Sequence, residues 1–252
     1  MCVVTYPLVS AVIPAKDESM NLPMLLSEIQ SVLSDHCQFE IIVVDDGSTD
    51  HTYAVCDEWG QNHPDVALTV VRHQHAVGQS TALLTAVHQA KGEWIVTLDG
   101  DGQNDPADIP ALMDAAAKQD NPHFCIAGYR KNRQDTEWKR FQSRFANAIR
   151  QAVLKDGVKD TGCGLKLIPR RTYLALPYFD HMHRFLPALI RRLDGQIDVV
   201  PVNHRGRWGG VSKYNALNRA WVGFIDMCGV LWLSRRCKNP QIENISQRAT
   251  HE

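Results

Sequence analysis

The chain lacks the cysteine spacing of disulfide-stapled or zinc-binding proteins. Its seven cysteines are scattered through 252 residues, and none forms a CxxC pair. Because an odd number of scattered thiols is typical of a reducing compartment, we expect a cytoplasmic protein with neither a zinc site nor a disulfide framework. A basic segment leading into an apolar core is also missing near the N-terminus, where Pro7 and Pro14 interrupt the pattern, so no signal peptide is expected.

A strong overall charge, internal repeats and low-complexity stretches are missing as well. The formal net charge is −1 and 44% of the residues are hydrophobic, which are ordinary values for a globular protein. The charge is unevenly spread, however, because residues 184–238 hold ten Lys and Arg against three Asp. A basic C-terminal quarter favours contact with an anionic surface or a phosphorylated substrate.

The chain does contain a regular alternation of apolar runs and amphipathic segments. The apolar runs predict buried strands at 8–13, 39–44, 67–72, 94–98, 124–129 and 197–202. Helical patterns lie at 21–33, 54–59, 78–91, 108–118, 138–154, 184–192 and 215–236, and residues 160–169 are glycine-rich and then extended. In the first helix the spacing predicts one inward stripe of Leu22, Leu25, Leu26, Ile29 and Leu33. This order predicts an α/β fold with a mostly parallel, doubly wound sheet flanked by helices.

Two acidic clusters follow predicted strands, at 43–50 (VVDDGSTD) and 98–103 (LDGDGQ). Parallel sheets bind ligands beyond the carboxyl ends of their strands, so these carboxylates fall at the expected ligand edge. Asp99 and Asp101, two positions apart across a glycine, can both reach one divalent cation, and the side-chain oxygen of Gln103 can join them. The sequence therefore predicts a Mg²⁺ or Mn²⁺ site completed by a diphosphate; the alternative is a solvated Asp/Gly turn.

Four motifs in order carry a family resemblance: 14–18 (PAKDE), 43–50, 78–83 (GQSTAL) and 99–106 (DGDGQNDP). Together they resemble the family 2 glycosyltransferases of GT-A fold, and the likeness covers residues 8–215. Residues 103–106 and 210–214 (GVSKY) are similar to the dolichol-phosphate mannosyltransferase-like, polyprenyl-phosphate branch. The resemblance implies inverting, metal-assisted transfer of a sugar from a GDP- or UDP-sugar to a polyprenyl phosphate.

The donor site is expected at the ends of the first, second and fourth predicted strands. Pro14 and Ala15 would form one wall of the pocket for the nucleotide base, and Glu18 would accept a hydrogen bond from the ribose or the base. Of the neighbouring acids, Asp45 or Asp46 would bind the base or ribose, whereas Thr49 or Asp50 would cap a helix. The expected donor contacts are Pro14, Ala15, Glu18, Asp45, Asp46, Asp99, Gly100 and Asp101.

A basic helix predicted at 138–154 has one apolar face and further faces with hydrogen-bonding and basic side chains. These faces suit a phosphorylated lipid acceptor, although a solvated surface helix has the same pattern. The resemblance implies that Arg130, Lys139 and Ser143 contact the acceptor phosphate. Arg140 is an alternative to Lys139.

The segment 204–214 is a cationic, glycine-rich loop that is expected to close over substrate. Arg207 and Lys213 would clamp the diphosphate or the acceptor phosphate. Nucleic-acid binding is the competing interpretation of this loop, but it leaves the Asp99–Asp101 pair without a purpose, so no nucleic-acid partner is expected. Asp101, Arg130 and Arg207 are the expected catalytic residues.

A convincing general base is missing late in the chain, where Asp160 is the only candidate. An acceptor that is itself a phosphate needs no strong base, because its second ionisation has a pKa of about 6. The open alternatives are transfer to a saccharide hydroxyl of a cell-surface glycan and a nucleotide-sugar-binding protein without turnover.

The expected organisation is a GT-A domain at 1–215, an amphipathic helix at 216–238 and a disordered tail at 239–252. The apolar part of the helix, 220–233, is about 21 Å long, short of the roughly 30 Å hydrocarbon core. With Trp221, Trp232 and basic ends, it is expected to lie in the interface on the cytoplasmic face of a membrane. The alternative is a helix packed on the domain or between subunits, and the oligomeric state is not indicated.

Overall fold

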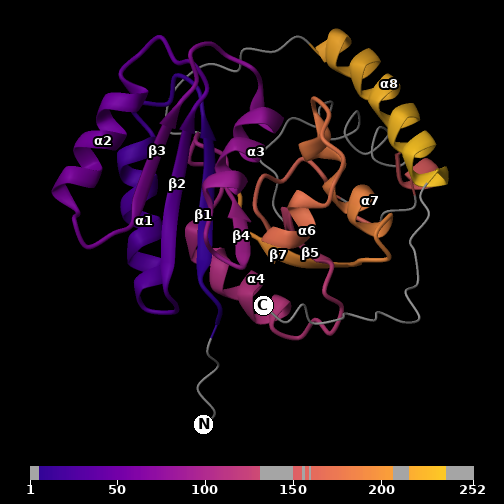
Figure 1. Cartoon of the computed structure of the whole chain (residues 1–252), viewed down its shortest axis with the longest axis horizontal. Coiled ribbons are helices and arrows are strands. Elements are labelled where there is room, and N and C mark those ends of the chain that lie inside the picture. The colour runs from indigo at the N-terminus through magenta and orange to yellow at the C-terminus, as the bar shows by residue number, and fades with distance from the viewer. Residues whose placement is uncertain (1–5, 131–149, 155–156, 159, 207–215, 237–252) are drawn as a thin grey trace, which may run out of the picture.

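The computed structural model describes residues 6–130, 150–154, 157–158, 160–206 and 216–236. Its first half alternates strictly between strand and helix, as predicted (Figure 1). Each strand pairs in parallel with its neighbours in the order β3-β2-β1-β4. The elements are β1 (Val9–Ala15), α1 (Leu22–Ser34), β2 (Phe39–Asp45), α2 (Thr52–Asn62), β3 (Leu68–Arg72), α3 (Gln79–Gln89) and β4 (Trp94–Thr97).

The second half extends the same sheet to seven strands, in the order β3-β2-β1-β4-β6-β5-β7. The elements that follow β4 are η1 (Pro106–Asp108), α4 (Ile109–Ala116), β5 (Phe124–Arg130), β6 (Lys166–Pro169), α6 (Arg170–Leu174), η2 (Met182–Arg184), α7 (Leu186–Arg191), β7 (Gln196–Val202) and α8 (Ala216–Arg235). The short helix α6 was not expected from the sequence.

One strand of the sheet is reversed. β6 pairs antiparallel with both β4 and β5, whereas β5 and β7 are parallel to each other. The first residue of β6, Lys166, therefore pairs with Thr97 near the end of β4. This reversal brings the glycine-rich segment before β6 to the edge where the other strands end.

Two hydrophobic clusters lie on opposite faces of the sheet because alternate strand residues point to opposite sides. Ile13 and Val43 belong to the cluster with α1, α2 and α4, whereas Val12 and Val44 belong to the cluster with α3, α6 and α7. Helix α1 confirms the predicted apolar stripe, because each of its five predicted inward residues is completely buried. These residues are Leu22, Leu25, Leu26, Ile29 and Leu33.

Helix α8 lies beside α7 at the right-hand side of Figure 1, where it is drawn in yellow. Met227 and Val230 are buried in the cluster that contains α7. Phe224, Ile225 and Trp232 are each more than half exposed. One face of α8 therefore packs on the domain, and the other carries exposed apolar side chains. Within the described ranges, no helix has the length and apolarity needed to cross a membrane.

Candidate active site

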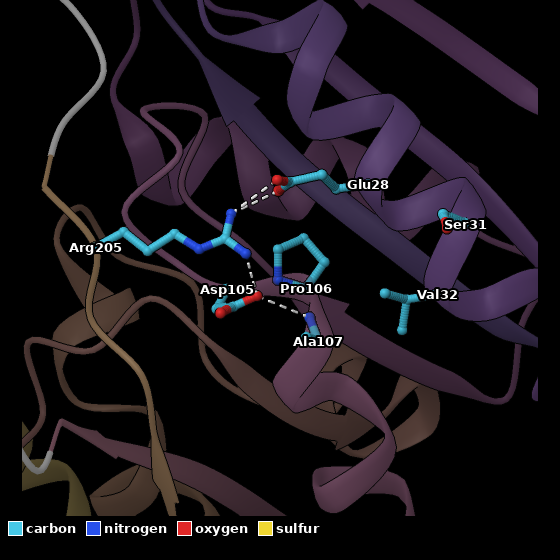
Figure 2. Close-up of a pocket in the computed structure, with 7 residues that line it drawn as sticks. All are labelled: Glu28, Ser31, Val32, Asp105, Pro106, Ala107 and Arg205. Atoms are coloured by element: carbon cyan, nitrogen blue, oxygen red, sulfur yellow. Dashed lines mark hydrogen bonds and ion pairs between the residues drawn. The ribbon is translucent and has the colours of Figure 1, made fainter.

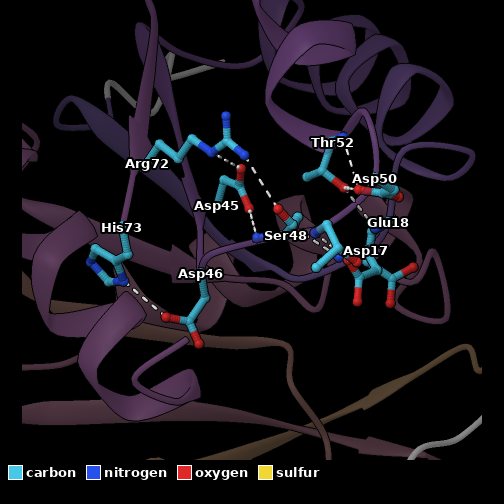
Figure 3. A network of polar contacts seen from close by, with 10 residues as sticks. Asp17, Glu18, Asp45, Asp46, Ser48, Asp50, Thr52, Arg72 and His73 are labelled. Atoms are coloured by element: carbon cyan, nitrogen blue, oxygen red, sulfur yellow. Dashed lines mark hydrogen bonds and ion pairs between the residues drawn. The ribbon is translucent and has the colours of Figure 1, made fainter. Parts of the chain in front are cut away.

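Asp45, the last residue of β2, is completely buried at the carboxyl edge of the sheet (Figure 3). Its Oδ1 accepts a hydrogen bond from the backbone N–H of Ser48 at 2.9 Å. Its Oδ2 lies 3.3 Å from Nε of Arg72 but receives no hydrogen bond in the described part of the chain. A buried carboxylate oxygen with an open acceptor position is suited to an N–H or O–H of a ligand.

Asp46 is held by the loop between β3 and α3. It accepts hydrogen bonds from His73 Nδ1 at 2.9 Å and from the backbone N–H groups of Val77 and Gly78 at 2.9 and 2.8 Å. Burial alone would raise the pKa of Asp46, but these hydrogen bonds and the charge of His73 hold it below its ordinary value. Asp46 therefore fixes the loop that leads into α3, whereas the second carboxylate oxygen of Asp45 lies beside Arg72 and receives no hydrogen bond from the described residues.

Gly47 makes the close approach of this loop possible. Its φ is +64°, and a Cβ on it would lie 2.6 Å from the backbone nitrogen of Ala76. A larger residue would meet both backbone strain and a clash with backbone atoms that cannot move aside. The loop from β3 can therefore pack against the end of β2 only because residue 47 is glycine.

The turn after β1 is joined to the turn after β2 by side-chain hydrogen bonds (Figure 3). Asp17 accepts from the backbone N–H of Thr49 at 2.8 Å, and the N–H of Glu18 donates to Thr52 Oγ1 at 2.9 Å. Asp50 accepts from the N–H of Thr52, the first residue of α2. The expected cap by Thr49 or Asp50 is corrected, because the N-cap position is His51, which makes no side-chain cap hydrogen bond. The Glu18 carboxylate accepts from Asn21 Nδ2 at 2.5 Å.

Pro14, Ala15 and Gly100 come together at the ends of β1 and β4. A Cβ on Gly100 would lie 3.3 Å from the carbonyl oxygen of Pro14 and 3.4 Å from Cβ of Ala15. The structure therefore places the predicted wall of the base against the residue between the two predicted metal ligands.

Asp99 follows β4 and is enclosed by three segments of the chain. Its Oδ1 accepts from Gln79 Nε2 at 2.9 Å, and its backbone N–H donates to Asn104 Oδ1 at 2.8 Å. The backbone of Gly164 approaches so closely that a Cβ there would lie 2.2 Å from Asp99 Oδ2. Burial, together with the charge of Asp101, raises the pKa of Asp99 to about 6.

Asp99 and Asp101 are acids of one short turn that influence each other electrostatically, and carboxylate oxygens are ligands suited to Mg²⁺ or Mn²⁺. Asp101 raises the pKa of Asp99 through like-charge repulsion, which a cation between them would relieve. The backbone of Gln103 donates to Asp101 Oδ1 at 3.1 Å. Over the described ranges, no cluster of three or more His, Cys, Asp or Glu side chains is arranged to hold a metal. The protein thus offers two carboxylates, and the remaining ligands must come from other groups.

Arg130, at the end of β5, forms a two-point ion pair with Asp160. Its Nε and Nη2 donate to the two carboxylate oxygens at 2.6 and 2.7 Å, and both side chains are largely buried. Gly162 passes close to the pair, since a Cβ on it would lie 3.1 Å from Arg130 Nη2. Asp160, the candidate base of the sequence analysis, is therefore the partner of a guanidinium. The charge of Arg130 reaches Asp99 and favours its ionised form, which lowers the pKa of Asp99 against the effect of burial.

The segment after β7 is anchored to the residues that follow Asp101 (Figure 2). Arg205 donates to both oxygens of Glu28 at 2.9 and 2.7 Å and also to Asp105, while its backbone N–H donates to the carbonyl of Gln103 at 3.1 Å. These contacts border a cavity of about 130 Å³ that lies between α1 and η1. Its lining residues are Glu28, Ser31, Val32, Asp105, Pro106, Ala107 and Arg205.

Arg205 was not singled out in the sequence, where it is one of several cations in the expected loop. Its ion pairs with Glu28 and Asp105 fix the first residues of the predicted loop 204–214 beside the Asp99–Asp101 motif. The predicted acceptor residues Lys139, Ser143, Arg207 and Lys213 lie outside the described residues. Gln79, Gly164 and Lys166 were also missed as site residues. The sequence could have indicated them only by position, because Gln79 lies at the start of a predicted helix and Gly164 and Lys166 lie in the glycine-rich segment 160–169.

Residues 10–174 match the family model described as "Glycosyl transferase family 2", and the chain belongs to this family. A dodecaprenyl-phosphate galacturonate synthase of Rhizobium johnstonii is 30% identical over 92% of this chain and 68% of its own length. An undecaprenyl-phosphate 4-deoxy-4-formamido-L-arabinose transferase of Pseudomonas aeruginosa is 32% identical over 84% of this chain. The chain spans 62% of that second relative.

Two solved structures show the same fold. A mannosyltransferase of Pyrobaculum calidifontis, in complex with GDP-Man and Mn²⁺, has a TM-score of 0.65 at 23% identity, covering 94% of this chain and 67% of its own. Glucosyl-3-phosphoglycerate synthase of Mycobacterium tuberculosis was solved in complex with Mn²⁺, UDP and glucosyl-3-phosphoglycerate. It has a TM-score of 0.66 at 19% identity, and the match covers 93% of this chain and 81% of the synthase chain. The predicted GT-A fold is confirmed, and the protein is a glycosyltransferase.

Proposed function

We propose that this protein transfers a sugar, with inversion, from a GDP- or UDP-sugar to a polyprenyl phosphate. The observation that carries the proposal is the pairing of Asp99 and Asp101 at the sheet edge, with the Arg130 guanidinium close enough to influence Asp99. Carboxylates for a metal–diphosphate complex and a guanidinium for a second phosphate are then present at one site. The names of the two relatives, which specify dodecaprenyl and undecaprenyl phosphate, support this acceptor class.

On the donor side, Asp45 is proposed to accept a hydrogen bond from the base or ribose. Its support is complete burial and an Oδ2 with an open acceptor position among the described residues. Pro14 and Ala15 would bound the base, and Glu18 would reach the ribose from the turn that is tied to Thr52. Asp46 contributes indirectly, because it holds the loop that delivers Gln79 to Asp99.

Asp99 and Asp101, with Gln103 as a further ligand, are proposed to hold Mg²⁺ or Mn²⁺. The ion would act as a Lewis acid that neutralises the charge growing on the departing nucleoside diphosphate. Gln79 orients the Asp99 carboxylate by its hydrogen bond, and Gly164 leaves room for that carboxylate. The two solved relatives contain Mn²⁺ with a nucleotide or nucleotide sugar, which supports a divalent ion here.

On the acceptor side, Arg130 is proposed to bind and orient the lipid phosphate. Asp160 fixes the plane of the guanidinium through its two-point ion pair and does not act as a base. Lys139, Ser143, Arg207 and Lys213 are proposed to complete this phosphate site. An acceptor phosphate with a second pKa of about 6 is largely ionised at neutral pH, so it can attack the sugar directly and in line.

The function is tested by screening GDP- and UDP-sugars for thermal stabilisation with Mn²⁺, followed by radiolabel transfer to undecaprenyl and dolichyl phosphate. The expected result is acceptor-dependent formation of a lipid-linked sugar. Hydrolysis of the donor at the same rate with and without lipid phosphate would contradict the proposal. Nucleotide binding without any turnover would favour the non-catalytic alternative.

Arg130→Ala is expected to raise the KM for lipid phosphate or lower kcat by about tenfold or more, because the guanidinium charge proposed to bind that phosphate is lost. Nucleotide affinity, measured by calorimetry with UDP or GDP, should change little. Arg207→Ala is expected to show the same pattern.

Arg72→Ala is the matched control, because Arg72 faces Asp45 on the proposed donor side. It should change nucleotide affinity more than the KM for lipid phosphate. Thermal denaturation of both variants checks that the fold is kept. An equal loss of nucleotide affinity in Arg130→Ala would move Arg130 to the donor site.

The protein is further proposed to bind the cytoplasmic face of a membrane through α8, within the proposed interfacial segment 216–238. Phe224, Ile225 and Trp232 supply the exposed apolar face, and Arg235 and Arg236 are exposed at its end. Each basic residue near an anionic surface contributes about 1 kcal/mol, and salt weakens that contribution. A lipid-phosphate acceptor would be reached from this surface.

The double variant Phe224→Ser, Trp232→Ser is expected to lose most of its sedimentation with anionic liposomes, because two large apolar side chains no longer enter the interface. Deleting the helix would be a poorer test, since Met227 and Val230 are part of the core. Met20→Ser, Met24→Ser is the control, because these methionines are exposed on the other half of the molecule. Unchanged liposome binding with a loss of dimer on size exclusion would favour the subunit-interface alternative.

A further inference from the structure

Lys166 is a buried cation for which the proposed mechanism has no role so far. Only 4% of this residue is exposed, and its ammonium donates to the backbone carbonyl of Cys163. Within the described part of the chain, no carboxylate lies within ion-pair distance of it. A buried ammonium is costly unless an opposite charge compensates it, so an anionic partner is expected nearby.

The reversed strand β6 directs this charge to the Asp99–Asp101 pair. Lys166 lies opposite Thr97 in the sheet, two residues before Asp99. The turn from Cys163 to Gly164, which the Lys166 ammonium holds, is the same turn that packs against the Asp99 carboxylate. The Lys166 ammonium is therefore held on the turn that packs against Asp99, and its charge reaches Asp99 and lowers the pKa of that carboxyl against the effect of burial.

We propose that Lys166 is a positioning residue that makes the site bind the metal–nucleotide complex in preference to the bare metal. Its fixed positive charge compensates the Asp99–Asp101 pair in the empty site and opposes a second cation there. The same charge attracts a diphosphate, which carries more negative charge than the metal neutralises. This inference rests on the proposed function, because it assumes that a metal–diphosphate complex binds at Asp99 and Asp101.

The two components can be measured separately, without turnover. Lys166→Met removes the charge and keeps a similar volume in a buried position. At pH 8 and low salt, free Mn²⁺ measured by electron paramagnetic resonance should show bare Mn²⁺ bound about tenfold more tightly than in the wild type. UDP or GDP should bind the Mn²⁺-saturated variant about tenfold more weakly by calorimetry.

Two further variants separate charge from structure. Lys166→Arg keeps the charge and should stay close to the wild type in both measurements, whereas a purely structural Lys166 would leave both Lys166 variants impaired alike. Lys91→Met, an exposed lysine before β4 at the other edge of the sheet, should change neither affinity.

Bare Mn²⁺ affinity in Lys166→Met that is unchanged or weaker, or nucleotide affinity that is unchanged, would overturn the proposal for Lys166. Loss of both affinities in Lys166→Met and Lys166→Arg together would overturn it in favour of a structural role. Asp101→Ala is measured alongside. If that variant keeps wild-type Mn²⁺ affinity, the metal site of the proposed function fails, and this inference fails with it.

Discussion

Asp101→Ala is expected to slow sugar transfer by at least about a hundredfold, because it removes one of two carboxylates that would hold the cation at the leaving diphosphate. The metal-dependent part of nucleoside diphosphate binding should be lost with it. Treatment with EDTA should reduce the wild-type rate to a similar level, and added Mn²⁺ or Mg²⁺ should restore the wild type but not the variant. Radiolabel transfer and calorimetry with and without metal measure these effects.

Asp57→Ala is the matched control for charge removal, because Asp57 is exposed on α2, where its carboxylate accepts a hydrogen bond from Gln61 one turn further on. It should keep the wild-type rate and metal response. The metal assignment would be wrong if Asp101→Ala transferred sugar normally or if the wild type were fully active in EDTA.

Gly164→Ala is the second variant with a large expected effect. Its Cβ would lie 2.2 Å from Asp99 Oδ2 and 2.8 Å from Asn104 Oδ1, far inside ordinary contact distance. Asp99 has a short side chain in an enclosed position, so its carboxylate must leave the orientation held by Gln79. We expect transfer to fall by about a hundredfold or more and Mn²⁺ affinity to weaken, with overpacking costing about 1–3 kcal/mol of stability.

Gly229→Ala provides the control for the methyl group itself. Gly229 lies in α8, and a Cβ on it would meet no described atom within 4 Å, so alanine there should leave activity unchanged and raise helix stability slightly. Gly164→Ala with wild-type turnover and Mn²⁺ affinity would show that Asp99 does not need its present orientation.

Much of the fold could be predicted from local patterns in the sequence. The stripe of Leu22, Leu25, Leu26, Ile29 and Leu33 was predicted from helical spacing, and all five side chains are buried on α1. The acids after β2 and β4 were assigned to the ligand edge for an equally local reason, since apolar runs end directly before them. Asp99 and Asp101 must lie close together because only one residue separates them, so their proximity could be predicted without knowing any long-range contact.

The sequence left open the choice between Asp45 and Asp46, and the tertiary structure gives the two carboxylates different hydrogen-bond partners. The two acids are adjacent in sequence, but distant segments supply them with different numbers of hydrogen-bond donors. The loop from β3 supplies three hydrogen bonds to Asp46, whereas Asp45 retains an oxygen without a hydrogen bond among the described residues. No local pattern distinguishes two neighbouring aspartates, because the partners come from elsewhere in the chain.

By itself, the sequence determined the alternation of strands and helices, the family and the acidic edge, since each depends on local periodicity or short motifs. Only the tertiary structure decided the direction of β6, because strand pairing joins residues far apart in the chain. That reversal sets Gly164 against Asp99 and brings Lys166 opposite Thr97, two residues before Asp99. The ion pair from Arg205 to Glu28 spans 177 positions and has the same origin. Side chains this distant meet only when the whole sheet has formed, which is why their roles were not visible in the sequence.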